Sequence, residues 1–445
     1  MSRPIVKLMS RGLCSTAFLR ELSALSEGEY MMLQTDPAVE VSLAVSAVAR
    51  MERVARESDA TVVYSDFRLC GDPSVQRCND YGAGSVRDDF DFGPVVMLRA
   101  DAVAACLAAS ETDYEYAGWY ALRLALSRMA LPVHIPEPLY DVAETSGNEA
   151  GGEAQFAYVD PRNRAVQIEM EDAFTRHLKR IGAWLPPRTA EADFGDLFPV
   201  EASVIIPVRN RVDTIGDAIF SALDQDADFP FNVIVVDNHS TDGTTEVIRR
   251  LADDPRLIHV VPQETTLGIG GCWNKALSHP MCGRFAVQLD SDDVYSGRDS
   301  LTRIVERFRT DRCAMVVGTY SLTDFSLNPI PPGVIDHREW TDANGHNNLL
   351  RINGMGAPRA FSTAIARRLP MPDVSYGEDY AMALRISREY RIGRIFDVLY
   401  LCRRWTGNSD AAPSREKMNG FNHYKDTLRG WEISARRLMN DDSRR

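Results

Sequence analysis

The fold class is decided by residues 202–225, ASVIIPVRNRVDTIGDAIFSALDQ. A β-branched apolar run ends in a polar loop, and apolar residues then recur at helical intervals. The same alternation continues through NVIVVD (232–237), TTEVIRRLADD (244–254), LIHVVP (257–262), NKALSH (274–279) and RFAVQLD (284–290). Strands that alternate with helices predict βαβ units, a parallel sheet and an α/β domain.

Acidic residues stand at the ends of two of these strands. Asp237 closes the second strand and Asp290 the fourth. In open parallel sheets, ligands bind beyond the carboxyl ends of the strands. We therefore expect both carboxylates to lie where a ligand binds.

Composition restricts the class of protein. The chain has 445 residues, 44% of them hydrophobic and 25% charged, as in soluble globular proteins of two or three domains. A net charge of −13 argues against nucleic acid as a partner. No apolar run approaches the length of a membrane span, and the start lacks the pattern of a secretory signal. The eight cysteines and eight histidines lack metal-ligand spacing, so we expect free thiols, no zinc site and a cytoplasmic location.

Four segments of chain are expected. Residues 201–410 carry the βαβ pattern, and a polar stretch followed by helical periodicity marks 151–200 as a helical connector. Apolar residues at helical intervals predict a C-terminal helix within 411–445, which either caps the domain or forms an oligomer contact. Residues 1–150 form the remaining segment.

Residues 1–150 carry a degraded copy of the main domain. Four anchors keep their order: GEYMMLQTDP (28–37) on GRFAVQLDSDD (283–293), DATVVYSDF (59–67) on CAMVVGTYSL (313–322), YEYAGWYALRLALSR (114–128) on YGEDYAMALRISREY (376–390), and EPLYDVAETSGN (137–148) on DVLYLCRRWTGN (397–408).

The copy keeps the apolar skeleton and loses the charged groups. In this alignment Gln34 replaces Asp290, Tyr116 and Ala117 replace Glu378 and Asp379, and Ala143 and Glu144 replace Arg403 and Arg404. The copy also begins too late to contain the first two βα units. We expect a truncated, non-catalytic domain that supports homodimerisation or acceptor docking.

Five ordered motifs, SVIIPVRN, VVDNHSTDGT, LDSDD, YGEDY and RRWTGNS, make residues 203–410 resemble a family 2 glycosyltransferase. The resemblance implies the GT-A fold, with a mixed, mainly parallel sheet, and a smaller truncated GT-A-like domain before it. It also implies inverting transfer of a hexosyl or N-acetylhexosaminyl group from a nucleotide-sugar, with UDP favoured, to a hydroxyl of a glycan or glycoconjugate. The setting it implies is cytoplasmic polysaccharide biosynthesis, with peripheral attachment at the inner membrane left open.

LDSDD (289–293) is the candidate metal motif. Two carboxylates at i and i+2 in a turn can face a diphosphate through a hard cation such as Mn²⁺ or Mg²⁺. The alternative is a solvated turn that caps a helix. By resemblance Asp292 is the metal ligand, with Asp290 on the ribose or metal side.

Further residues are assigned to the nucleotide-sugar by resemblance. Asp237 faces uracil, and Pro207, Val208 and Asn210 line the base pocket. The run TLGIGGCWNKAL (266–277) combines glycines with a helix start, which favours phosphate, and makes Asn274 and Lys275 candidates.

Catalysis is assigned to YGEDY (376–380) and RRW (403–405). Sugar transfer needs a base for the acceptor hydroxyl, and the resemblance gives that role to Asp379, beside Glu378. The alternative for this pair is helix capping. Arg403 and Arg404 can stabilise the charge on the leaving diphosphate. Leu401 occupies the glutamine position of processive relatives, which argues against processive synthesis.

Two rival functions stay open. A nucleotidyltransferase also uses a metal-binding Asp in an α/β nucleotide site, and it would release pyrophosphate. A non-catalytic sugar-binding protein is the other. The Gly- and Asn-rich stretch 336–361 is expected to line the acceptor side.

Overall fold

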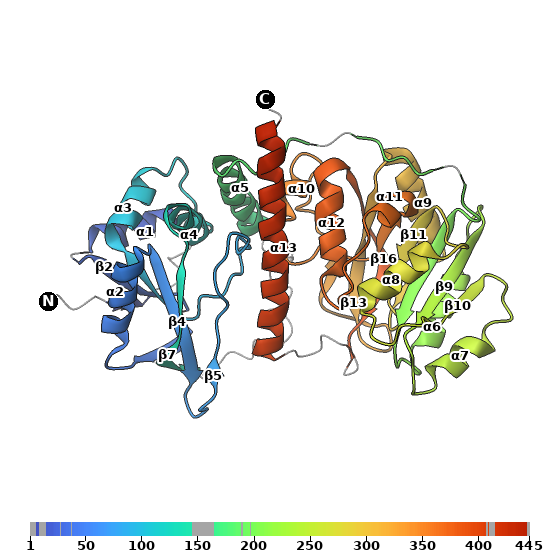
Figure 1. The fold of residues 1–445 in the computed structure, drawn as a ribbon, viewed down its shortest axis with the longest axis horizontal. Coiled ribbons are helices and arrows are strands. Elements are labelled where there is room, and N and C mark those ends of the chain that lie inside the picture. The colour runs from blue at the N-terminus through green and yellow to red at the C-terminus, as the bar shows by residue number, and fades with distance from the viewer. Residues whose placement is uncertain are drawn as a thin grey trace.

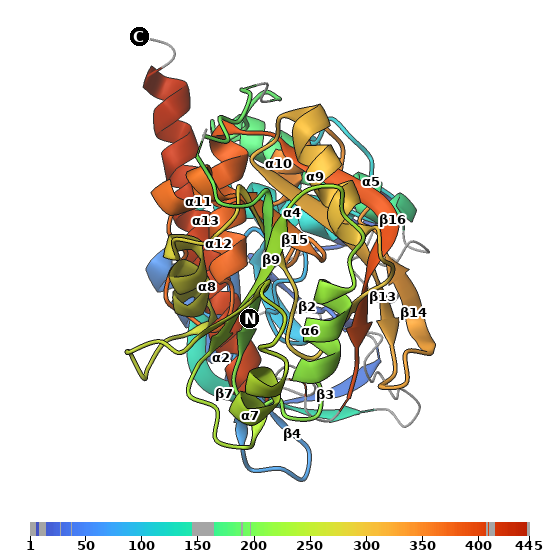
Figure 2. The ribbon, with the colours of Figure 1, turned by 90° about the vertical axis from the view of Figure 1, so that its right-hand side faces the viewer.

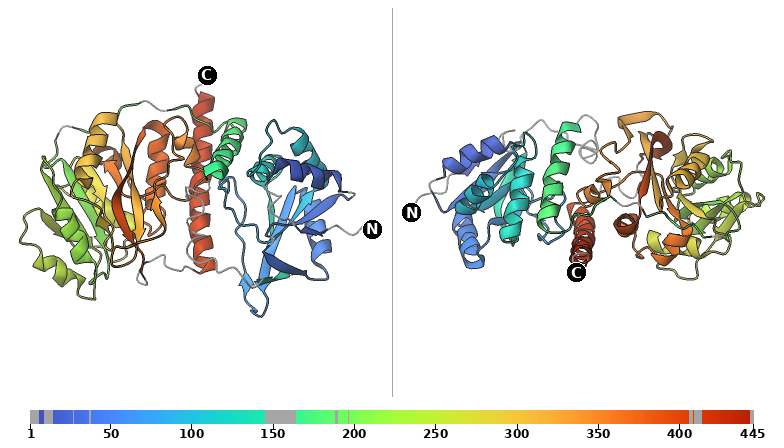
Figure 3. Two further views of the ribbon diagram at one scale, coloured as in Figure 1. Left: turned by 180° about the vertical axis from the view of Figure 1, so that it is seen from behind. Right: turned by 90° about the horizontal axis from the view of Figure 1, so that it is seen from above.

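A computed structural model describes residues 6–8, 15–26, 28–36, 38–144, 164–187, 190–195, 197–405, 408 and 414–442. Two α/β domains flank a long helix, α13 (Arg415–Asp442), with the shorter α5 (Arg164–Arg180) beside it (Figures 1 and 3). Most of the polar part of the expected connector, 145–163, lies outside the described residues. Within the described ranges, every helix is too short or too polar to cross a lipid bilayer. The seven cysteines described are free thiols.

The second domain contains a nine-stranded sheet. Its strands follow the order β10 (Leu257–Val260), β9 (Phe231–Asp237), β8 (Ala202–Val208), β11 (Phe285–Gln288), β15 (Arg359–Ser362), β13 (Met315–Thr323), β16 (Ile392–Arg403) and β12 (Val294–Tyr295), with β14 (Pro329–Ile335) beside β13. The first four strands are parallel, and β13 and β16 run in the same direction. The other three run the opposite way, so the prediction of a mixed, mainly parallel sheet is confirmed.

Helices cover both faces of this sheet (Figure 2). One layer contains α8 (Ile269–Ser278), α11 (Thr363–Arg368) and α12 (Glu378–Glu389); α6 (Ile215–Leu223), α7 (Thr244–Arg250) and α9 (Ser300–Asp311) lie on the other side. The helical spacing in the sequence is borne out in α6, because Ile215, Ala218 and Ile219 are fully buried against the sheet.

The first domain repeats this topology. Its seven-stranded sheet follows β1 (Val6–Leu8), β2 (Tyr30–Gln34), β6 (Val95–Arg99), β4 (Val62–Leu69), β7 (Val133–Glu144) and β3 (Val39–Leu43), with β5 (Val75–Gln76) beside β4. Every pairing direction matches the path β8-β11-β15-β13-β16-β12 with β14 beside β13. The helices are α1 (Thr16–Ala24), α2 (Ala47–Ser58), α3 (Ala100–Ala108) and α4 (Gly118–Met129). Because β1 corresponds to β8, the expectation that both initial βα units are missing is wrong; the described strands lack counterparts of β9 and β10.

The registers correct two positions of the alignment. Val133 pairs with Val63 as Gly393 pairs with Val316, and the ends of α4 (Met129) and α12 (Glu389) precede Val133 and Gly393 by the same number of residues. Gly118 and Trp119, rather than Tyr116 and Ala117, therefore stand at the positions of Glu378 and Asp379. The error arose because Tyr114 was aligned with Tyr376, whereas the matching tyrosines are Tyr120 and Tyr380.

The alignment of the two domains is also shifted by one residue at the metal motif. Arg99 and Ser362 each end a strand directly before a helix, and they pair with Tyr30 and Phe285. Counting from these pairs places Thr35, not Gln34, at the position of Asp290. Neither correction restores a carboxylate to the first domain at these positions.

The two domains meet through matching loops and helices. α5 packs on α4 as α13 packs on α12. Tyr120 Oη donates to the Val86 carbonyl and the equivalent Tyr380 Oη donates to the Leu349 carbonyl, so the loop around Val86 corresponds to the loop around Leu349. The first loop contacts α13 through Arg87 and Asp426 (3.2 Å). The second contacts α5 through Asn344 and Glu171 (2.8 Å) in the region of α10 (Gly345–Asn348). Each domain therefore contacts the terminal helix of the other in a reciprocal arrangement.

Candidate active site

Asp237 ends β9 and organises the loop that follows. Its carboxylate accepts hydrogen bonds from the backbone N–H of Ser240 (3.0 Å) and the hydroxyl of Thr245, and its Oδ2 lies 3.4 Å from His259 Nε2. Burial alone would raise the pKa of Asp237, but these hydrogen bonds outweigh it and hold the pKa well below the ordinary value. The carboxylate is therefore ionised and rigidly held at the carboxyl end of the sheet.

The first loop lies against this carboxylate. Val208 is paired with Asp237 in the register of β8 and β9, next to Pro207. Asn210 follows with a positive φ, and its side-chain oxygen accepts from the Thr241 N–H (2.8 Å). The predicted base-pocket residues thus come together beside Asp237.

The three aspartates after β11 are crowded. Burial raises the pKa of Asp290; the neighbouring Asp292 raises it further, whereas Arg359 and Gln288 lower it. The pKa of Asp293 is raised well above its ordinary value by burial and by the charges of Asp290 and Asp292. Asp292 Oδ2 lies 3.5 Å from Arg211 Nε and 3.2 Å from Asn408 Nδ2. Asp293 accepts from the backbone N–H of Arg403 (2.8 Å), so it holds the turn.

This crowding fits a hard cation. Within the described residues, no three Asp, Glu, His or Cys side chains converge into a complete cage. Mg²⁺ and related cations are held by one or two carboxylates when substrate phosphates and water supply the other ligands. Asp290 and Asp292 supply that donor set, and a cation would relieve their mutual repulsion.

A chain of polar contacts joins these aspartates to the candidate catalytic motif at the start of α12. Asp379 Oδ2 lies 3.0 Å from the side-chain Nε of Arg359, the backbone N–H of Arg359 donates to Gln288 Oε1 (3.0 Å), and Gln288 Nε2 donates to Asp290 Oδ1 (2.9 Å). The path exists because β15 runs antiparallel to β11, which brings Arg359 to the carboxyl end of β11. Two motifs 89 residues apart in sequence, at Asp290 and Asp379, are thus part of one site.

The two acids at the start of α12 differ in protonation. Burial, reinforced by Asp379, raises the pKa of Glu378 to about 8. Burial would also raise the pKa of Asp379, but Arg359 and then Lys425 lower it below its ordinary value. At neutral pH the pair therefore holds one proton, on Glu378, and Asp379 is a carboxylate.

The cationic motif after β16 has a structural task. Arg403 is buried; its Nη1 donates to Asp217 (2.8 Å), its Nε donates to the Asp292 carbonyl, and it stacks on Phe325. It therefore fixes the metal motif in place. The backbone N–H of Arg404 donates to the Thr323 carbonyl (2.8 Å).

The glycine run of α8 has a different use from the one expected. A Cβ at Gly270 would lie 1.9 Å from the Pro372 carbonyl oxygen, so the glycines allow segment 372–374 to approach the helix. Asp373 accepts from the Gly268 N–H (2.7 Å) and thereby occupies the start of the helix. Asn274 forms two hydrogen bonds with the backbone of Met371, and Lys275 pairs with Glu264 at the surface (2.6 Å).

The polar stretch 336–361 is largely enclosed. His337, Glu339, His346 and Asn347 are buried, and His346 and Asn347 bind the Leu185 carbonyl. Much of this stretch therefore joins the domains, rather than forming an open wall for an acceptor.

Sequence reasoning missed Arg359, Gln288, Arg211 and Asn408. Gln288 had a signal, since it is a polar residue that directly follows the apolar run Phe285–Val287 of a predicted strand. Arg359 belongs to the Gly- and Asn-rich stretch 336–361, but nothing in that stretch marked it individually, and it reaches the site only through strand pairing.

Residues 203–362 match the family model described as Glycosyl transferase family 2. These residues form a family 2 glycosyltransferase domain. A putative teichuronic acid biosynthesis glycosyltransferase, TuaG of Bacillus subtilis, is 38% identical over 120 residues, which cover 27% of this chain and 46% of TuaG. The O-antigen chain rhamnosyltransferase WbaN of Salmonella anatum is 27% identical over 128 residues, 29% of this chain and 39% of WbaN. The chain spans less than half the length of these relatives.

The similarity to solved structures is weaker. The TarS 1–349 structure from S. aureus in complex with UDP-GlcNAc is 18% identical, with a TM-score of 0.40, and covers 51% of this chain and 70% of that one. A mannosyltransferase from Pyrobaculum calidifontis in complex with GDP-Man and Mn²⁺ is 20% identical, with a TM-score of 0.39, covering 63% and 84%.

Proposed function

We propose that the glycosyltransferase domain, residues 201–410, transfers a sugar with inversion from a nucleotide-sugar, UDP-linked in our assignment, to a hydroxyl of a glycan or glycoconjugate. The observation that carries the proposal is the path from Asp379 through Arg359 and Gln288 to Asp290. It places an ionised carboxylate and a candidate diphosphate site at one edge of the sheet. The names of TuaG and WbaN support a glycan acceptor.

The donor would lie across the carboxyl ends of β8, β9 and β11. Pro207, Val208, Asn210 and Asp237 would surround the base. Asp292, with Asp290 beside it, would hold Mn²⁺ or Mg²⁺, which supplies positive charge to the diphosphate. Arg211 lies beside the same carboxylate and adds a second cation.

Asp379 would accept the acceptor's hydroxyl proton. The hydroxyl oxygen forms a bond to the anomeric carbon on the face opposite the phosphate, the bond from that carbon to the phosphate oxygen breaks, and the nucleoside diphosphate departs with the electron pair. Arg403 supports this step by fixing the Asp292 turn, and Arg404 is our candidate for the leaving diphosphate. We place the reaction in the cytoplasm, where nucleotide-sugars are made.

Residues 1–150 are, in this proposal, a partial copy without chemistry. The described part lacks the counterpart of β9, which carries Asp237, and has Gly118 and Trp119 at the acid positions. One nucleotide should therefore bind per chain. Residues 151–200 and 411–445 contribute α5 and α13, which join the two domains.

Calorimetric titration with UDP, GDP, CDP and dTDP, with and without Mn²⁺, tests the donor site. We expect one nucleotide to bind with a stoichiometry of one in the presence of the cation, and Asp292→Ala to abolish binding. Failure of all four nucleotides would overturn the proposal. Pyrophosphate release from a nucleoside triphosphate would instead establish a nucleotidyltransferase, and binding without transfer to any acceptor would establish a sugar-binding protein.

A further inference from the structure

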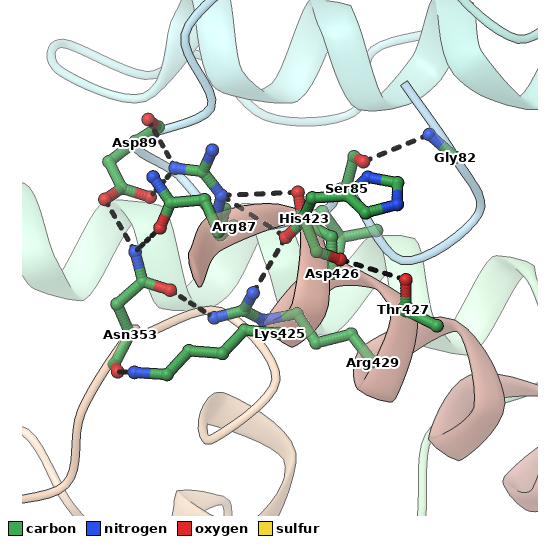
Figure 4. A network of polar contacts seen from close by, with 12 residues as sticks. Gly82, Ser85, Arg87, Asp89, Asn353, His423, Lys425, Asp426, Thr427 and Arg429 are labelled. Carbon is green, nitrogen blue, oxygen red and sulfur yellow. Dashed lines mark hydrogen bonds and ion pairs between the residues drawn. The ribbon is translucent and has the colours of Figure 1, made fainter. Parts of the chain in front are cut away.

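Lysine is rare in this chain, and one lysine is buried beside the candidate base. Five of the 50 basic residues are lysines, at positions 7, 179, 275, 417 and 425. Lys425 comes from α13 and is 6% exposed. Its Nζ donates to the Asn353 carbonyl (2.6 Å; Figure 4). The same Nζ lies 3.3 Å from Tyr376 Oη and 4.3 Å from the centre of that ring.

The surroundings hold Lys425 without neutralising it. Among the described residues, no carboxylate lies within ion-pair distance of its Nζ. A Cβ on Gly377, the residue directly before Glu378 and Asp379, would lie 3.5 Å from Lys425 Cε, and Lys425 Nζ lies 5.5 Å from the centre of the Tyr380 ring, so the ammonium stands at the start of α12. The charged groups that act on it are Asp379 and Glu378 of that helix, Arg359 of β15 and Arg429 of its own helix.

Residues of the first domain hold Asn353 and the helix α13, and thereby hold Lys425 in place. Asn353, whose carbonyl binds Lys425, donates to Asp89 Oδ2 (3.0 Å) and accepts from Arg429 Nη2 (2.6 Å). Asp426 is shared by Arg87 of the first domain and Arg429 of α13 (Figure 4). The helix therefore cannot shift without breaking contacts between the domains.

The two copies carry opposite charges at this point. In the first domain, Glu169 of α5 accepts from the backbone N–H groups of Tyr116 (2.7 Å) and Ala117 (3.1 Å), at the start of α4. At the matching start of α12, the terminal helix presents the cation Lys425. The second domain, which has Glu378 and Asp379, therefore has the cation Lys425 near its helix start. The first domain, which lacks these acids, has the carboxylate of Glu169 there.

We propose that Lys425 is a positioning residue that holds Asp379 in its ionised form from the C-terminal helix. The inference deepens the proposed function and depends on Asp379 as the base. A buried cation stabilises a nearby carboxylate strongly because little water screens the attraction. Burial in turn lowers the pKa of Lys425 to about 8, so this support is lost as the pH rises above that value.

The electrostatic interaction between Lys425 and Asp379 can be measured without a sugar donor or acceptor. Selective ¹³Cε labelling gives one NMR signal for each of the five lysines, and the Lys425→Arg variant identifies the signal of Lys425. We expect Asp379→Asn to lower the pKa of Lys425 and to leave that of Lys275 unchanged. An unchanged pKa of Lys425 in the Asp379→Asn protein overturns the proposal, whatever the chain transfers.

The effect on catalysis is read from the pH profile. We expect Lys425→Met to move the acid limb of kcat upward by about one pH unit, since each unit is a tenfold change in the ionised fraction of the base. Lys425→Arg should restore it, and Lys417→Met, on the exposed side of the same helix, should match the wild type. An acid limb that stays in place in folded Lys425→Met, or in Lys425→Gln if the first variant unfolds, contradicts the proposal. If no nucleotide-sugar is turned over but the NMR coupling is present, the proposed function fails and the coupling stands.

Discussion

At the scale of single residues, the site depends on the unequal protonation of Glu378 and Asp379. Both stand at the start of one helix, Glu378 buried and Asp379 23% exposed, and Arg359 decides which of them keeps the negative charge because its guanidinium contacts Asp379. The helix N-terminus adds to this stabilisation. The result is a carboxylate that is ionised at neutral pH.

Asp379→Asn removes the proposed base and preserves its shape. We expect turnover to fall by roughly 10²–10⁴-fold, because general base catalysis contributes that much. Donor binding, measured by calorimetry, should be unchanged, since Asp379 is not assigned to the nucleotide. Turnover close to the wild-type value would remove Asp379 from this role.

Arg359 should be needed in its charged form. Arg359→Met leaves Asp379 without its ion-pair partner, and because about a fifth of each side chain is exposed, the loss should be smaller than the roughly 3–5 kcal/mol of a fully buried pair. We expect a lower melting temperature and an acid limb of kcat at higher pH, with Arg359→Lys intermediate because lysine cannot reproduce the planar guanidinium contact. A pH profile identical to that of the wild type would show that Arg359 acts on stability alone.

The residues of the site differ in how visible they are in sequence. Asp237, Asp290, Asp292 and Asp379 stand in short motifs at strand or helix ends, where chemistry is expected. Arg359 and Lys425 belong to segments whose partners are distant in sequence, so only strand pairing and helix packing bring them to the acids. Asn274 and Lys275 were chosen for their place in a glycine-rich run, and that run serves helix packing.

At the scale of elements, α8 shows how packing explains a glycine pattern. The helix start is filled by Asp373, and the backbone of segment 372–374 passes where side chains would stand. The same pattern in sequence also fits a phosphate loop, so the sequence could not separate the two uses.

Gly270→Ala tests this close approach. Its Cβ would meet the Pro372 carbonyl, and overpacking of this kind costs about 1–3 kcal/mol. Gly420→Ala in α13 is the matched control, because its Cβ meets nothing within 4 Å and alanine in an open helical position stabilises by about 0.5–1 kcal/mol. Urea unfolding should therefore give shifts of opposite sign, and equal shifts would contradict the packing described.

The strands and helices of residues 202–290 were predicted because each has its own apolar period, whereas β12 to β16 were not predicted one by one. The first domain was harder. Its anchors share an apolar skeleton that tolerates a slip of one or two residues, and only the strand registers fixed which residues correspond. The strand β1, only three residues long, had no separate signal.

At the scale of the whole molecule, the two domains are held by buried charges. Arg351 is 1% exposed and pairs with Asp88 of the other domain. Arg351→Met leaves Asp88 without this partner, and we expect a loss of about 3–5 kcal/mol in the free energy of unfolding. The surface pair Arg20 and Asp113 (2.6 Å) is the control, because Arg20→Met should cost about 0–1 kcal/mol. Similar losses in the two variants would show that the interdomain pair adds little.

The reciprocal contact of the two domains also bears on self-association. Asp88 and Arg351 occupy equivalent places, two residues beyond Val86 and Leu349. A pair of first domains meeting in this geometry would bring Asp88 against Asp88, and a pair of second domains would oppose Arg351 to Arg351. Like charges repel in either assembly and attract only when the halves differ. The junction thus favours the union of unlike halves and disfavours the pairing of two first domains or of two second domains from neighbouring chains.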